Sequence, residues 1–141
     1  MYLIDTSVWI DYFREVKKPH VYAFHSILDQ KIPYGISSVI FQEILQGAAT
    51  VLSFSKLVEY LSTLRIYEPE DSILSYQNAA KLYFDCRKQG ITIRSTIDCL
   101  IAEIAIENNL ILLHNDKDFE ALSQTTPAFK QTRTLPITRG Y

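Results

Sequence analysis

The chain has 141 residues, of which 48% are hydrophobic and 21% charged, with few glycines and prolines. This composition is that of a folded protein and excludes a disordered one, and the length fits one domain over residues 1–141. The formal net charge of −2 provides no broad basic surface for a nucleic acid, but Lys130, Arg133 and Arg139 follow the last acid, Glu120. Bulk charge therefore neither favours nor excludes a nucleic-acid partner.

Cys86 and Cys99 lie in predicted helices between apolar neighbours. Two isolated cysteines make neither a disulfide framework nor a zinc site, so we expect reduced core thiols. An acid already stands at position 5, which disfavours a secretory signal with a basic start, and no apolar run is long enough to span a bilayer. These features predict a soluble, cytoplasmic protein.

In chain order, the first half of the chain predicts short strands that alternate with helices. Residues 2–5 form an apolar strand ending in an acid, and residues 6–14 continue as a helix. Apolar side chains at helical spacing mark a second helix around residues 21–28, before a second strand at residues 34–36.

The third helix is predicted from its ends. Ser37 and Ser38 are suitable N-caps, and the helix runs through Gln46 to Gly47. An amphipathic helix over residues 54–64 follows.

The second half repeats the alternation of strands and helices. A strand at residues 65–67 leads to a long helix that begins after Pro69, reaches about Lys88 and is stopped by Gly90. The last elements are expected to be a helix at 96–108, a strand at 110–114 and a strand at 135–137.

This order indicates an α/β protein with a mostly parallel sheet. Ligands of such sheets bind beyond the carboxyl ends of the strands. Asp5 and Asp116 are both expected just past strand ends.

Asp98 has the strongest physical case among the acids. On a helical wheel, Glu103 and Glu107 mark the solvent face of its helix, and Asp98 projects to the opposite side. An inward carboxylate is costly unless a cation or several donors compensate it. The alternative is a capping box formed by Ser95 and Asp98, and the two interpretations are compatible.

The other acids each have an ordinary explanation. Glu43 stands mid-helix one turn from Gly47, where a glutamate is usually a surface residue, although the missing glycine side chain leaves its face open. Asp5 can be a plain N-cap, and Asp116 and Asp118 can belong to a turn.

Taken together, the acids indicate a metal site. Asp5, Glu43, Asp98 and Asp116 would repel one another if brought together without a cation. An all-oxygen site of this kind suits Mg²⁺ or Mn²⁺, as one ion or two. Such a site can activate water for an in-line displacement at phosphorus, which is the chemistry of phosphodiester cleavage.

Three stretches that contain these acids resemble the PIN domain, and in particular the VapC-type toxins of bacterial toxin–antitoxin pairs. They are YLIDTSVWIDYF (2–13), SSVIFQEILQGA (37–48) and STIDCLIAEIAIENNLILLHNDKDF (95–119). The resemblance implies a three-layer α/β/α sandwich and an acidic quartet of Asp5, Glu43, Asp98 and Asp116, with Asp118 as an auxiliary acid. It also implies a metal-dependent endoribonuclease that uses Mg²⁺ or Mn²⁺, an antitoxin that inhibits it, and a homodimer.

The histidines stand apart from this pattern. VapC-type proteins commonly have a small hydroxyl residue where this chain has His114, which is either a base or extra ligand or, by the simpler interpretation, a histidine at the core edge. His20 and His25 lie outside the matching stretches and are expected at the surface.

We therefore expect a toxin that cleaves RNA to leave a 5′-phosphate and a 3′-hydroxyl, with Asp5, Asp98 and Asp116 holding the metal directly and Glu43 completing the site. Thr6, Ser7 and Asn115 are candidates to orient carboxylates or substrate, and helix-start or turn roles are the alternative.

Two surfaces are assigned more loosely. Arg14, Lys17, Lys18 and the basic tail can follow an RNA backbone or form a solvated charge run. The helix at 54–64 can dock an antitoxin, whose arginine would enter the acids, or can simply pack on the core.

Other functions remain as alternatives. One is a catalytically weak PIN-like module that binds nucleic acid or an antitoxin and contributes to repression of its own operon. A DxD-type phosphatase and a phosphoacceptor domain are enzymatic rivals, but the latter needs paired acids after the first strand, where Asp5 stands alone.

Overall fold

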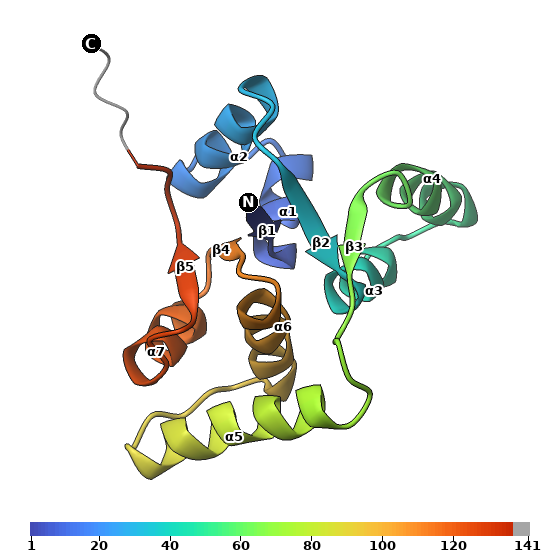
Figure 1. Cartoon of the computed structure of the whole chain (residues 1–141). Helices are drawn as coiled ribbons and strands as arrows, with labels where there is room; N and C mark the ends of the chain where they lie inside the picture. Colours follow the sequence, from blue (N-terminus) through green and yellow to red (C-terminus); the bar gives the residue numbers. More distant parts are fainter. Residues whose placement is uncertain (137–141) are drawn as a thin grey trace.

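A parallel sheet forms the centre of the computed structural model, which describes residues 1–136 (Figure 1). Its strands lie in the order β3-β2-β1-β4-β5, and each neighbouring pair is parallel. The strands are β1 (Tyr2–Ile4), β2 (Tyr34–Ser37), β3 (Arg65–Tyr67), β4 (Ile111–Leu113) and β5 (Lys130–Thr132). The prediction of an α/β fold with a parallel sheet is confirmed.

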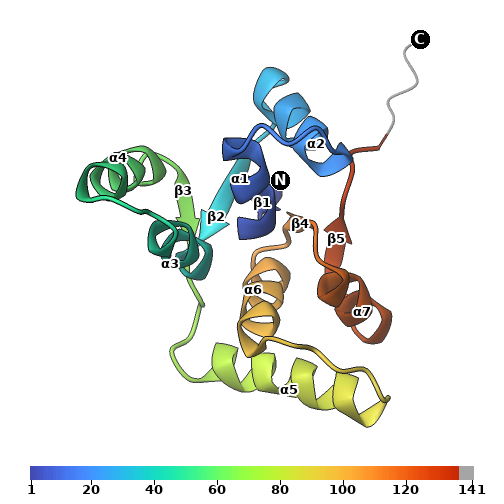
Figure 2. The same ribbon diagram turned by 180° about the vertical axis from the view of Figure 1, so that it is seen from behind.

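The helices form two packed groups, which lie in different parts of the molecule in both views (Figures 1 and 2). In one group α1 contacts α2 and α3, and α3 contacts α4; in the other, α5, α6 and α7 contact one another. Their bounds are α1 (Thr6–Phe13), α2 (Pro19–Asp29), α3 (Ser38–Gln46), α4 (Val51–Leu61), α5 (Leu74–Lys88), α6 (Thr96–Glu107) and α7 (Lys117–Thr125).

The strand order reverses next to β1. From β1 the chain continues to β2 and β3 on one side, whereas β4 and β5 lie on the other side. Loops that leave the carboxyl ends of β1 and β4 therefore diverge to opposite sides and leave a crevice, which is the usual ligand position of an open parallel sheet. Asp5 directly follows β1, and Asp116 follows β4 by a short loop.

Most predicted elements are confirmed, and two errors concern the C-terminal part. The last strand is at Lys130–Thr132, while Leu135 and Pro136 are not in a strand and Ile137 lies outside the described residues. The helix α7 was not predicted, because the Asn-Asp sequence before it was interpreted as a simple turn. In fact Asp116 is the N-cap of α7, and its backbone and side chain begin a helix there.

The core lies on both sides of the sheet and includes the middle of α6, where Cys99 through Ala105 are all buried. Trp9 of α1 and Phe24 of α2 pack with a ring-centroid distance of 4.8 Å. Cys86 and Cys99 are buried free thiols, as expected. Among residues 1–136, no helix combines the length and apolar character needed to cross a membrane.

One histidine differs from its prediction. His25 is exposed as expected, but His20 is buried and its Nε2 lies 2.6 Å from Asp11 Oδ2. This pair joins α2 to α1, so the polar side chain is buried together with its partner.

Candidate metal site

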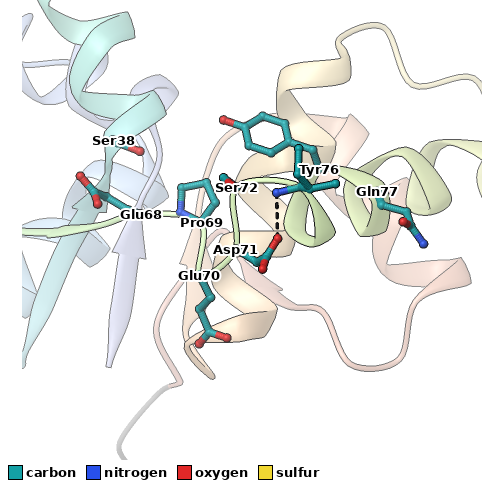
Figure 3. Close-up of a pocket in the computed structure, with 9 residues that line it drawn as sticks. Ser38, Glu68, Pro69, Glu70, Asp71, Ser72, Tyr76 and Gln77 are labelled. Atoms are coloured by element: carbon teal, nitrogen blue, oxygen red, sulfur yellow. Dashed lines mark hydrogen bonds between the residues drawn. The ribbon is translucent and has the colours of Figure 1, made fainter.

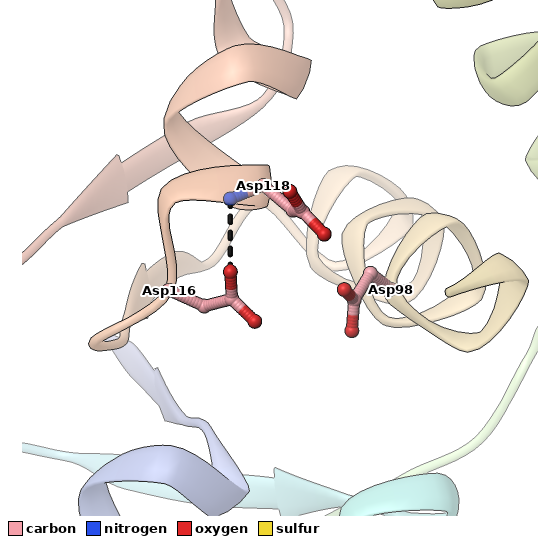
Figure 4. Close-up of side chains that lie close together, drawn as sticks. All are labelled: Asp98, Asp116 and Asp118. Carbon is pink, nitrogen blue, oxygen red and sulfur yellow. Dashed lines mark hydrogen bonds between the residues drawn. The ribbon is translucent and has the colours of Figure 1, made fainter. Parts of the chain in front are cut away.

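Three aspartates converge at the carboxyl edge of the sheet (Figure 4). Asp98, Asp116 and Asp118 each offer a carboxylate oxygen, and these oxygens lie within 4.8 Å of one another. Asp98 comes from the first turn of α6, whereas Asp116 and Asp118 come from the start of α7. Two segments that are separate in sequence thus bring their acids to one point.

Asp98 reaches this point for a reason that differs from the sequence argument. Glu103, which was expected to mark the solvent face, is buried against α5 and accepts a hydrogen bond from Asn78 Nδ2 at 3.2 Å. Because α5 covers that face, the helix is enclosed on most sides. The inward direction of Asp98 is nevertheless correct, and the alternative capping box does not form, since Ser95 makes no side-chain cap hydrogen bond.

Asp5 is buried next to this group and is held by the start of α1. Its Oδ2 accepts hydrogen bonds from the backbone N–H and the hydroxyl of Ser7. Asp5 is therefore the N-cap of α1, as the simpler interpretation expected. Its own N–H donates to Leu113 O at 2.9 Å, which ties the end of β1 to the end of β4. Asp5 is therefore both a cap and a member of the acid site.

Glu43 approaches from α3. Its Oε1 accepts a hydrogen bond of 2.9 Å from the Thr6 hydroxyl, and it is only partly exposed. The Thr6 hydroxyl therefore holds the Glu43 carboxylate, and the charge of Glu43 acts on Asp5.

Ser7 connects the two strand ends a second time. Its hydroxyl donates to Asp5 and accepts the backbone N–H of Asn115 at 3.0 Å. The side-chain oxygen of Asn115 in turn accepts from Arg133 Nη1 at 2.7 Å. Ser7 and Asn115 therefore position the site, and Arg133 of the basic tail is engaged within the protein, where it also pairs with Glu120.

Arg94, which was not among the expected site residues, also contacts the acids. Its Nε lies 3.1 Å from Asp118 Oδ2 and its Nη2 lies 3.2 Å from Asp116 Oδ1. The sequence did hold one signal: a positive charge just before the N-terminus of a helix opposes the helix dipole, so another group has to compensate it.

His114 is a structural histidine. It is fully buried, its Nδ1 accepts the backbone N–H of Asp116 at 3.0 Å, and its Nε2 lies 2.6 Å from Gln131 Oε1. An accepting Nδ1 requires the neutral ring with the proton on Nε2, which donates to Gln131. Burial lowers the pKa of His114, in agreement with a neutral ring. The simpler interpretation of this residue is the correct one.

Burial and neighbouring carboxylates raise the pKa values of Asp5 and Asp98. Burial raises the pKa of Asp5 to about 6, against the hydrogen bonds from Ser7 and with a further increase from Glu43. Burial, and then repulsion from Asp5, Asp116 and Asp118, raises the pKa of Asp98 to about 7. The unpaired charges are therefore costly at neutral pH, and a divalent cation would remove that cost.

The residues present fit a hard divalent ion. All donors are carboxylate oxygens, which Mg²⁺ and Mn²⁺ prefer. Within the described part of the chain, the carboxylate of Asp98 accepts no hydrogen bond, so both of its oxygens are free to bind a cation. Asp98, Asp116 and Asp118 form the tightest group, whereas Asp5 and Glu43 border it.

A groove begins at Glu43 and runs between α1, α3 and α4. Its apolar side chains come from all three helices, and Gly47 lines it together with Glu43. The groove is lined by Ile10, Phe13, Arg14, Glu43, Ile44, Gly47 and Leu57.

A broader hollow of about 990 Å³ is a poor candidate for the site. It lies between the start of α3 and the start of α5, and Figure 3 shows the residues that line it. Asp71 in this lining accepts the backbone N–H groups of Ile73 and Leu74. Its lining includes Glu68, Glu70 and Asp71 but none of the acids described above, which are Asp5, Glu43, Asp98, Asp116 and Asp118. Its acids are already hydrogen-bonded or face solvent, so it does not offer a converging ligand set.

Known proteins are similar to this chain in sequence and in fold. The PIN domain family matches residues 2–124. Ribonuclease VapC11 of Mycobacterium tuberculosis and a VapC ribonuclease of Mycobacterium bovis are each 33% identical over 130 residues, which covers 89% of this chain and 94% of theirs.

Solved structures agree at the level of the fold. VapBC2 from Rickettsia felis, bound to a DNA fragment from its promoter, has a TM-score of 0.69 at 20% identity and covers 93% of this chain and 96% of that one. FitAcB from Neisseria gonorrhoeae has the same TM-score and identity and covers 94% and 97%. These neighbours are consistent with the expected three-layer α/β/α sandwich. The chain therefore belongs to the PIN-domain family and, within it, to the VapC proteins.

Proposed function

We propose that this protein is a toxin of a toxin–antitoxin pair and acts as a Mg²⁺-dependent endoribonuclease. The observation that carries the proposal is the convergence of Asp98, Asp116 and Asp118 at the strand-order reversal, with Asp5 and Glu43 beside them. The VapC ribonucleases that share a third of the sequence support the same activity.

The acids have different tasks in this proposal. Asp98 and Asp116, together with Asp5, hold the cation, and Glu43 and Asp118 complete the site. Bound Mg²⁺, or Mn²⁺ in its place, supplies Lewis-acid activation of water and stabilises charge at the phosphodiester.

The hydroxyl residues keep the acids in place before a substrate arrives. Ser7 orients Asp5, Thr6 orients Glu43, and Asn115 holds Ser7 through its backbone N–H. A preorganised site of this kind does not have to reorder during the reaction. The proposed products are a 5′-phosphate and a 3′-hydroxyl, and the substrate is a cytoplasmic RNA.

The groove beside Glu43 is the proposed antitoxin site. Ile10 and Phe13 are both about half exposed, and Val51 and Leu52 at the start of α4 are more exposed still. An amphipathic segment fits such an apolar groove, and a basic side chain at its end would meet Glu43. Leu57 of α4 lines this groove together with residues of α1 and α3.

The homodimer is a separate proposal. Tyr76 and Phe84 of α5 are about half exposed, and their spacing of eight residues places them on one side of the helix. Exposed large apolar side chains that share a face are typical of interfaces. We propose that a second copy covers this face.

The activity is tested with Asp98→Asn, which removes the charge and keeps the shape of the side chain. Cleavage of a labelled single-stranded RNA in Mg²⁺ should fall by at least about 100-fold. The matched control is Asp29→Asn, because Asp29 is exposed at the end of α2 and makes no contact with the site. Undiminished cleavage by Asp98→Asn would refute the proposal.

The non-catalytic alternative makes a different prediction. A module that only binds nucleic acid or an antitoxin would show no Mn²⁺-dependent thermal stabilisation, and Asp98→Asn would leave its antitoxin binding unchanged. Stabilisation by Mn²⁺ that is lost in Asp98→Asn favours the enzyme.

A further inference from the structure

Arg94 lies in the short segment between α5 and α6, and its backbone is fixed. Ile93 before it is buried, and the Arg94 N–H donates to Asp118 Oδ2 at 3.2 Å. The side chain is 63% exposed. The guanidinium is therefore anchored at its base and open to solvent at its outer edge.

The guanidinium occupies only one oxygen of each acid that it contacts. Asp118 Oδ2 accepts from Nε, and Asp116 Oδ1 accepts from Nη2. The other oxygen of each carboxylate accepts no hydrogen bond within residues 1–136, and in Figure 4 the Asp118 and Asp98 carboxylates are directed toward each other. Arg94 thus borders the metal site without closing it.

The remaining N–H groups of Arg94 have no protein acceptor in the described part of the chain. A guanidinium has five N–H donors, and the two ion pairs use only Nε and Nη2. The planar fork formed by the rest matches the oxygens of a phosphate group. Because Nη2 touches Asp116, a phosphodiester bound at the acids lies within reach of this edge.

We propose that Arg94 is the phosphate-binding residue of this site, a fixed cation held by Asp116 and Asp118 whose outer N–H edge binds the RNA phosphate beside the metal. This inference rests on the proposed ribonuclease function. It also gives Arg94 opposite effects on the two ligands, since its charge repels the divalent ion and attracts the phosphate.

A purely structural role for Arg94 makes the contrary prediction. If the guanidinium only keeps Asp118 in place, its removal disorders that carboxylate and weakens metal binding and RNA binding together. The direction of the change in metal affinity therefore separates the two roles.

The experiment compares Arg94→Ala and Arg94→Lys with the wild type. The matched control is Arg87→Ala, which removes the same charge from an exposed position on the last turn of α5. Mn²⁺ affinity is measured by calorimetric titration without RNA. RNA affinity is measured in EDTA by the fluorescence anisotropy of a labelled single-stranded oligonucleotide, and cleavage is measured in Mg²⁺.

Arg94→Ala should bind Mn²⁺ about 3- to 10-fold more tightly, and its RNA affinity and kcat/KM should each fall about 10-fold or more relative to Arg87→Ala. Arg94→Lys retains the charge but loses the fork, so its Mn²⁺ affinity should stay near that of the wild type while cleavage recovers only in part. This variant also serves if Arg94→Ala does not fold.

Two results would overturn the assignment. One is weaker Mn²⁺ binding by Arg94→Ala, and the other is RNA affinity and cleavage no different from those of Arg87→Ala. A failure of the proposed function itself would be seen in a different variant. Asp98→Asn would then still bind Mn²⁺.

Discussion

The two sides of the acid site are stabilised in different ways. On one side, Asp116 and Asp118 contact the guanidinium of Arg94, and Asp116 also accepts the backbone N–H of Asp118. On the other side, Asp5 and Glu43 accept only neutral donors from Ser7 and Thr6 within the described chain. Asp98 lies between the two sides and accepts no donor there.

The difference in compensating charge indicates which acids need a bound cation. A positive charge already balances part of the Asp116–Asp118 side, whereas hydroxyl groups orient Asp5 and Glu43 without neutralising them. Burial, together with repulsion from neighbouring carboxylates, raises the pKa values of Asp5 and Asp98. A divalent ion bound at Asp98 would therefore offset both the cost of burial and the repulsion from the neighbouring acids.

Among the changes that test this comparison, Ser7→Ala has the largest expected effect, because it removes a hydroxyl from the Asp5–Glu43 side. This change removes the hydroxyl that Asp5 and Asn115 share, so cleavage should fall about 10- to 100-fold. Because Ser7 lowers the pKa of Asp5, the acid limb of the pH–rate profile should also move to higher pH.

Ser55→Ala on the exposed face of α4 is the matched control for Ser7→Ala. A loss of activity without any movement of the acid limb would mean that Ser7 acts on something other than Asp5.

The next effect concerns the free energy of unfolding. Most substitutions lower this quantity, whereas Asp98→Asn is expected to raise it. In EDTA, Asp98→Asn should be more stable than the wild type by about 1–2 kcal/mol after allowance for solvent screening, since it removes a repelled charge. Chemical denaturation at pH 8 measures this difference. A less stable variant would show that Asp98 is compensated by a contact within the protein.

The pH dependence follows from the same acids. Their folded-state pKa values, about 6 for Asp5 and about 7 for Asp98, exceed the ordinary value of 3.8. The folded metal-free protein thus binds more protons than the unfolded chain near pH 5, and its stability should fall as pH rises through 6 to 7. Mn²⁺ affinity should change in the opposite direction, since binding requires the ionised acids.

Denaturation in EDTA and Mn²⁺ titration across this range measure both changes. Stability and Mn²⁺ affinity that rise together with pH would contradict the expected coupling.

The smallest expected effect is at a buried acid outside the site. Burial also raises the pKa of Glu103, but its partner is Asn78 of α5. Glu103→Gln should leave Mn²⁺ affinity and cleavage within about twofold of the wild type, because a raised pKa without converging acids makes no metal site. A tenfold loss of Mn²⁺ affinity or of cleavage would mean that Glu103 of α6 also belongs to the site.

The sequence predicted the fold well where local patterns determine it. Strands bounded by turn residues and the Ser37 cap were recognised, because side-chain spacing and capping act within a few residues. The helix α7 was missed because an Asn-Asp pair suits a turn as well as an N-cap. The burial of Glu103 and His20 depends on α5 and on Asp11, which local spacing does not reveal.

The sequence could indicate which acids follow the strand ends, but it could not indicate their geometry. Acids at strand ends must meet at one edge of a parallel sheet, so Asp5 and Asp116 could be placed from the pattern alone. The contact between Arg94 and Asp118 joins a loop to a helix start 24 positions away, and no periodicity encodes it. The position of Asp118 also depends on contacts between distant segments. It was expected as an auxiliary acid, and it lies in the tightest group of three.

The most direct measurement of the central claim is the thermal unfolding of the wild type and Asp98→Asn, each with EDTA and with Mn²⁺. The acids are repelled until a cation joins them, so Mn²⁺ should raise the wild-type Tm by several degrees. Asp98→Asn should begin with the higher Tm in EDTA and lose most of the Mn²⁺ increase. A wild type that Mn²⁺ does not stabilise, or a variant that gains as much from it, would contradict the account.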